Sequence, residues 1–143
     1  MLPTAKRLSS YRTISVDTAS PGKLILMLYD GALRFLRAAE DGFLLEGPGA
    51  RGEAVHNNLL KAQEIIAELQ RCLNLRDGGE FAINMFRLYD FMVMRLIEAN
   101  MKKQPENVRV VIQLLGEVRE AWDQMLREQG AGAMQSASLS MSA

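Results

Sequence analysis

The chain has 143 residues, the length of one domain that can bury a core of its own. Seventeen lysine and arginine residues balance seventeen aspartate and glutamate residues, so the net charge is zero, which argues against a nucleic acid or an anionic membrane as a partner held by bulk charge. The single cysteine, Cys72, excludes an internal disulfide and fits a reducing compartment such as the cytoplasm.

Residues 1–17 form the expected N-terminal arm, in which apolar residues recur among polar ones. Lys6 and Arg7 precede no long apolar run, so we expect no secretory signal peptide. Leu8 and Tyr11 are three residues apart and can dock together on a neighbouring surface. We therefore expect the arm to dock on the helical body, with a frayed terminus as the alternative.

The first predicted helix covers about residues 21–41 and is apolar on nearly every side. Ser20 can accept a hydrogen bond from a free N–H of the first turn, and Pro21 suits the first helical position, where its missing N–H costs nothing. Leu26 and Leu33 point away from the main apolar face in this pattern. A helix with apolar residues around nearly its whole circumference is typically buried or packs against additional partners.

Three further helices are predicted, over about residues 51–73, 80–102 and 105–128. Each has apolar residues at helical spacing, and turns rich in glycine, proline or asparagine separate them. Helices of this length with short connections predict an all-α fold, an antiparallel four-helix bundle in a single domain over residues 1–129. Residues 130–143 are small, polar and low in complexity, and we expect a flexible tail there.

Catalytic and metal sites are poorly supported by the sequence. His56 is the only histidine and falls on a polar helix face, whereas Cys72 falls on an apolar stripe and is expected to be a core residue. The two are too far apart on one helix to form a nucleophilic pair. The Glu53-x-x-His56 spacing matches half of a di-iron bundle site, but no second histidine exists to complete it. We expect no enzyme, no metal and no cofactor.

Apolar residues exceed what the core of a bundle needs. They extend around the third and fourth helices beyond the stripe that faces the core. The second helix adds an uncharged stripe, made up of His56, Leu60, Gln63, Ala67, Gln70 and Asn74. Its amide side chains could hold the backbone of a peptide, with a solvated face as the alternative. Together these features predict a long peptide-binding surface that includes Leu26, Leu33, Leu60, Gln63, Ala67, Gln70, Ile83, Met94, Val110 and Ile112.

Four stretches, taken in order, resemble the flagellar secretion chaperones of the FliS family. They are VDTASPGKLILMLYDG at residues 16–31, AQEIIAEL at 62–69, LNL at 73–75 and GGEFAINMFRLYDFMVMRLIEAN at 78–100. The resemblance covers most of the chain, from about residue 11 to residue 127. Gly22 and Lys23 depart from the family pattern, in which acidic residues are frequent at these positions.

The resemblance implies a helical bundle that acts in the cytoplasm as an export chaperone. Its partner would be the disordered C-terminal segment of flagellin, which wraps around the bundle and partly folds into helices. Binding would prevent premature polymerisation and aid delivery to the flagellar type III export apparatus, without nucleic acid and without membrane insertion. Leu8 and Tyr11 match the apolar pair of the family's N-terminal segment, which implies a cap over part of the binding groove.

One alternative comes from a different class of protein. Extra apolar faces could serve a self-associating structural or adaptor bundle that has no flagellin client. The chaperone hypothesis also allows a homodimer when no client is bound.

Overall fold

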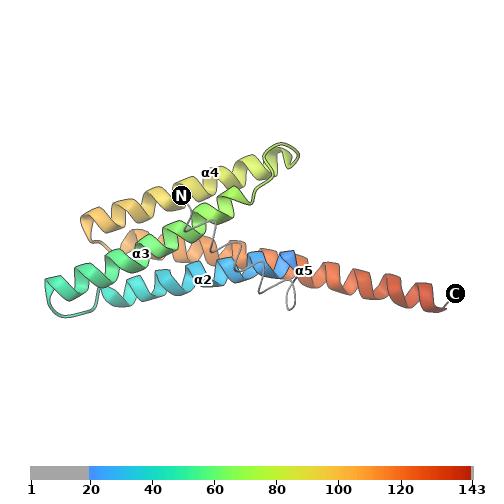
Figure 1. The fold of residues 1–143 in the computed structure, drawn as a ribbon, viewed down its shortest axis with the longest axis horizontal. Helices are drawn as coiled ribbons and strands as arrows, with labels where there is room; N and C mark the ends of the chain where they lie inside the picture. The colour runs from blue at the N-terminus through green and yellow to red at the C-terminus, as the bar shows by residue number, and fades with distance from the viewer. Residues whose placement is uncertain (1–19, 143) are drawn as a thin grey trace.

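The structure, a computed structural model, describes the backbone of residues 20–142 and the side chains of residues 20–130. Successive helices run in opposite directions (Figure 1). No β-strand occurs within residues 20–142, and none of the helices described there is long and apolar enough to cross a membrane. The four helices are α2 (Pro21–Gly42), α3 (Pro48–Arg71), α4 (Gly79–Lys102) and α5 (Glu106–Ser142).

The helices form a ring in which each one contacts two others. α2 packs against α3 and α5, and α4 also packs against α3 and α5, so α2 and α4 lie on a diagonal of the bundle. This arrangement confirms the predicted antiparallel four-helix bundle. Its core is built from the apolar stripes of all four helices and includes the fully buried side chains of Leu36, Leu59, Ile66, Met92, Leu96 and Leu115.

The start of α2 is the one that the sequence predicts. The Ser20 hydroxyl oxygen accepts a hydrogen bond from the Lys23 backbone N–H at 3.2 Å, and Pro21 occupies the first helical position. This bond satisfies one of the N–H groups that the first turn of a helix leaves unpaired. The cap therefore fixes the first residue of α2.

Two other helix ends differ from the predicted ones. α3 begins at Pro48 rather than near residue 51, because proline is well suited to the first turn of a helix. α5 continues to Ser142, whereas the sequence predicted an end near Glu128 and a tail from residue 130. No proline follows Glu128, and the alanine, glutamine, methionine and leucine residues there favour a helix. In Figure 1 this last part of α5 extends past the other helices.

Candidate functional site

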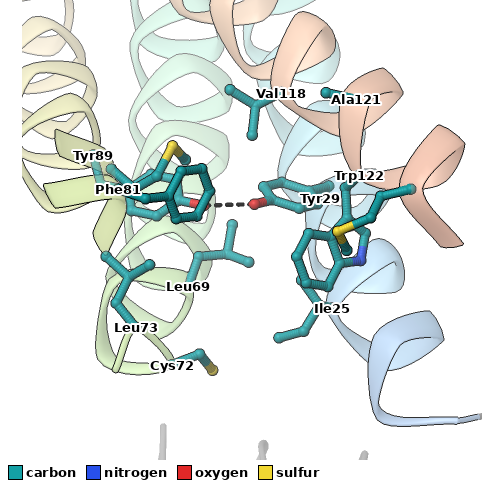
Figure 2. Close-up of a pocket in the computed structure, with 12 residues that line it drawn as sticks. Ile25, Tyr29, Leu69, Cys72, Leu73, Phe81, Tyr89, Val118, Ala121 and Trp122 are labelled. Atoms are coloured by element: carbon teal, nitrogen blue, oxygen red, sulfur yellow. Dashed lines mark hydrogen bonds between the residues drawn. The ribbon is translucent and has the colours of Figure 1, made fainter. Parts of the chain in front are cut away.

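An apolar pocket lies at one end of the bundle, where all four helices contribute side chains (Figure 2). Its volume is about 340 Å³, which is in the range of ligand-binding pockets. None of the lining side chains is charged. The pocket is lined by Ile25, Tyr29, Leu69, Cys72, Leu73, Phe81, Met85, Tyr89, Val118, Ala121, Trp122 and Met125.

The antiparallel order of the helices gathers these residues at one end. α2 and α4 both begin here, α3 ends here, and α5 runs past on its way to its C-terminal part (Figure 1). Ile25 lies in the second turn of α2, Leu73 just after α3, and Phe81 in the first turn of α4. Phe81 is exposed at the rim, whereas Tyr89 is buried at the base. Within residues 20–130 the pocket thus has a mouth beside Phe81 and is closed below by the core.

Two buried tyrosines meet at the base of the pocket. The hydroxyl oxygens of Tyr29 on α2 and Tyr89 on α4 are hydrogen-bonded at 2.6 Å (Figure 2). Burial raises the pKa of both tyrosines above the ordinary value, so both hydroxyls keep their protons at neutral pH. The bond joins two helices that lie on a diagonal of the bundle.

Trp122 forms the α5 side of the pocket next to Tyr29. The two ring centroids are 6.5 Å apart with an interplanar angle of 60°, a tilted contact that is favourable between aromatic rings. The indole N–H donates to the Gly22 carbonyl oxygen at 2.9 Å. Two contacts with α2, one through the Tyr29 ring and one through the Gly22 carbonyl oxygen, therefore hold Trp122 in place.

Ion pairs outside the pocket also tie α5 to α2. The Arg119 Nε lies 2.9 Å from the Asp30 Oδ1, and the Arg109 Nε lies 3.2 Å from the Glu40 Oε2. The hydrogen bond to Asp30 raises the pKa of Arg119. These contacts fix the register of the two helices that carry one wall of the pocket.

The residues predicted for a peptide-binding surface have different environments, and none of them lines the pocket. Leu60, Ile83, Met94 and Val110 are exposed. Half-buried positions are those of Leu26, Gln63, Ala67, Gln70 and Ile112. The predicted cap residues Leu8 and Tyr11 lie outside the described part of the chain.

Two placements correct expectations from the sequence. Leu33 is 4% exposed and belongs to the core, although the pattern pointed it away from the main apolar face. The reason is that α2 is covered by α3 on one side and by α5 on another, so a wider part of its circumference is buried. Cys72 was expected in the core but is exposed, because it follows the last residue of α3 at the mouth of the pocket.

The uncharged stripe of α3 contacts α4 near both of its ends. Asn100 is hydrogen-bonded to the His56 ring at 2.9 Å. At the other end the Gln70 side-chain nitrogen donates to the Phe86 carbonyl oxygen at 3.0 Å and to the Asp90 carboxylate at 2.9 Å. At these two positions the polar groups of the stripe connect two helices of the bundle and are already engaged.

The structure offers little for catalysis in the part of the chain that it describes. Within residues 20–130 no three side chains of histidine, cysteine, aspartate or glutamate come together as metal ligands. His56 is exposed and takes part in the contact with Asn100.

A second apolar surface lies on the outer face of α4, which we define as Phe91, Met94, Ile97 and Met101. All four side chains are exposed, Met101 by 80% and Met94 by 64%. Charged residues flank this face, and the Arg95 guanidinium lies 5.0 Å from the centre of the Phe91 ring. Exposed apolar patches of this kind mark surfaces that bind other proteins.

The periodicity of the sequence gives no indication of the pocket. Its lining residues lie on core-facing stripes, where a packed bundle is the simpler expectation. One signal was available, because buried tyrosine and tryptophan side chains need hydrogen-bond partners and are frequent at binding surfaces. Tyr29, Tyr89 and Trp122 are the aromatic residues of the pocket with such a polar group.

Comparisons with known proteins agree on one family. The chain matches the family described as "Flagellar protein FliS" over residues 4–129. A flagellar secretion chaperone FliS from Vibrio cholerae is 38% identical over 122 residues, which cover 82% of this chain and 87% of the relative. The Bacillus subtilis protein of that name is 36% identical over 121 residues, 85% of this chain and 86% of the relative. The Salmonella typhimurium protein is 40% identical over 128 residues, 85% of this chain and 91% of the relative.

Proposed function

Because the chain belongs to the FliS family of flagellar secretion chaperones, we propose that it binds the disordered C-terminal segment of flagellin in the cytoplasm. Binding prevents premature polymerisation of flagellin and aids its delivery to the flagellar type III export apparatus. The family is one of chaperones, so the chain is not an enzyme. The observation that supports the proposal best is the apolar pocket formed by all four helices.

Burial of apolar side chains supplies the free energy of binding. A disordered client loses conformational entropy when it folds on its partner, so it needs a large apolar contact area. The pocket provides the anchor, and an amphipathic helix of the client can continue over the neighbouring helix faces. The accessible residues predicted from the sequence extend this surface, namely Leu26, Leu60, Gln63, Ala67, Ile83, Met94, Val110 and Ile112.

The N-terminal arm caps the pocket in the absence of client. The chain enters α2 next to the pocket, because Ile25 in the second turn is one of the lining residues. Leu8 and Tyr11 supply the apolar contacts of the cap. Replacing both by alanine exposes the pocket, and binding of an apolar fluorescent dye to the free protein rises. Dye fluorescence equal to that of the wild type would mean that these two residues do not shield the pocket.

Complex formation with two forms of flagellin tests the proposed client. Light scattering after size-exclusion chromatography is expected to show a one-to-one complex with full-length flagellin. Flagellin that lacks its C-terminal segment gives no complex, because the segment carries the apolar side chains that the pocket buries. Tight binding of the truncated flagellin would overturn the proposal.

A pair of matched variants tests the pocket. Ala121 is exposed and lines the pocket, so Ala121→Asp places a carboxylate against its apolar wall. Burying that charge under the client lowers affinity roughly tenfold or more. Ala50 is also exposed on a helix but lies outside the pocket, and Ala50→Asp leaves affinity unchanged. Equal affinities of the two variants, measured by calorimetry, would place the client elsewhere.

A self-associating bundle is the second candidate, and the outer face of α4 favours it. Glu98 lies 3.0 Å from the Lys102 Nζ and 3.4 Å from the Arg95 guanidinium, so oppositely charged groups border the exposed apolar side chains. Two copies could bury this face against each other. A dimer that persists in excess flagellin favours this candidate, whereas conversion to a one-to-one complex favours the chaperone.

A further inference from the structure

The tyrosine pair at the base of the pocket contains more hydrogen-bond donors than its bond uses. Tyr29 and Tyr89 are 3% and 2% exposed and both line the pocket, so the pocket is the side from which another group can reach them. Each neutral hydroxyl carries one proton and can accept as well as donate. The single bond between them, at 2.6 Å, uses one of the two protons.

Both protons are present at physiological pH. Burial raises the pKa of each tyrosine, and neither loses its proton near neutrality. Within the described residues, the bond between the two hydroxyls is the only hydrogen bond that the structure gives to either of them. Among residues 20–130 the second proton therefore has no hydrogen-bond acceptor, which costs free energy in a buried, apolar environment.

The surroundings of the pair limit what can accept this proton. The other polar atoms of the lining side chains are the weakly accepting sulfur atoms of Cys72, Met85 and Met125 and the indole nitrogen of Trp122. The Trp122 N–H is a donor and already donates to the Gly22 carbonyl oxygen. No lining side chain is charged, so the pocket suits an apolar, uncharged segment of chain that brings one acceptor. A main-chain carbonyl oxygen is such an acceptor.

We propose that the Tyr29–Tyr89 pair donates its second proton to a main-chain carbonyl oxygen of the client segment seated in the pocket. This inference rests on the proposed function, which supplies the client. A disordered chain arrives with carbonyl groups that have no partner within the chain, and burying one unpaired is costly. The last turn of a helix also leaves carbonyl groups free. The pair thus selects a client segment that ends a helix or runs extended at the base of the pocket.

Removal of both hydroxyls tests this assignment. Titration calorimetry compares full-length wild type and the Tyr29→Phe/Tyr89→Phe variant with a flagellin C-terminal peptide as ligand. The variant binds about threefold to tenfold more weakly, the effect of one net hydrogen bond. Unchanged affinity means that the client does not accept the proton, and tighter binding means that the N-terminal arm accepts it in the free protein. Either of these results overturns the assignment.

The two single variants serve as controls for packing. Each keeps one hydroxyl with its proton, so at least one of them binds the peptide as tightly as the wild type. Losses in both single variants as large as in the double variant would assign the effect to distorted packing and contradict our inference. A wild-type protein that does not bind the peptide contradicts the proposed function itself. Normal wild-type binding with an unchanged double variant contradicts only the role of the tyrosine pair.

Discussion

Trp122 of α5 donates its indole N–H to the carbonyl oxygen of Gly22 in the first turn of α2, at 2.9 Å. The side chain of Leu126 on α5 can approach the α2 backbone closely here because Gly22 has no Cβ atom; a Cβ at this position would collide with the end of the Leu126 side chain. The bond places the only tryptophan of the chain between the first turn of α2 and the pocket.

Trp122 fluorescence is therefore expected to report whether the pocket is occupied. Its ring is half-buried, and a client seated in the pocket excludes further water from it. Excess flagellin C-terminal peptide shifts the emission maximum to shorter wavelength. The Ala121→Asp variant needs roughly tenfold more peptide, or more, to give the same shift, because it binds the client more weakly. An unchanged spectrum of the wild type under conditions where calorimetry detects binding would locate the client outside the pocket.

The ion pair between Asp30 and Arg119 is expected to stabilise the contact between α2 and α5 modestly. Its side chains are 44% and 24% exposed, so solvent screens part of the attraction. A double-mutant cycle with alanine at both positions, measured by urea denaturation, gives a coupling of about 0.5–1 kcal/mol. The more exposed pair of Glu40 and Arg109 joins the same helices and gives a smaller value. Equal coupling free energies for the two pairs would contradict the expectation that the less exposed pair interacts more strongly.

The fold could be predicted from the sequence because its signals are local. The apolar spacing of each helix and the cap at Ser20 depend on residues within one or two turns. The burial of Leu33 depends on α5, which lies far away in the chain and packs on a second side of α2. The Tyr29–Tyr89 bond joins residues 60 positions apart, and no local pattern indicates such a pair. Local patterns did not indicate the pocket either, because its lining residues come from helices that are far apart in the sequence.

Leucine and methionine truncations are expected to separate core from surface. Leu33→Ala leaves a cavity in the core and lowers the free energy of unfolding by about 2–5 kcal/mol. Met94 is 64% exposed, and Met94→Ala changes the same quantity by at most about 0.5 kcal/mol. Urea denaturation monitored by circular dichroism measures both. If Leu33→Ala lowered the free energy of unfolding as little as Met94→Ala, the placement of Leu33 in the core would be wrong.

The tyrosine pair is expected to make stability fall at alkaline pH. The folded-state pKa values of Tyr29 and Tyr89 are raised by burial, whereas tyrosines in the unfolded chain ionise near pH 10. Below pH 10 both states keep these protons, and the pair adds no pH dependence. Above it the unfolded state binds fewer protons than the folded state, so the free energy of unfolding falls as pH rises.

Each retained proton contributes a slope of up to about 1.4 kcal/mol per pH unit above pH 10. The Tyr29→Phe/Tyr89→Phe variant lacks both groups, and its free energy of unfolding falls less steeply over the same range. Tyr11 and the lysine residues are common to the two proteins, so the difference between the curves isolates the pair. Urea denaturation at intervals from pH 8 to about pH 11.5 gives both curves. Parallel curves would show that the two hydroxyls ionise as readily in the folded protein as in the unfolded chain.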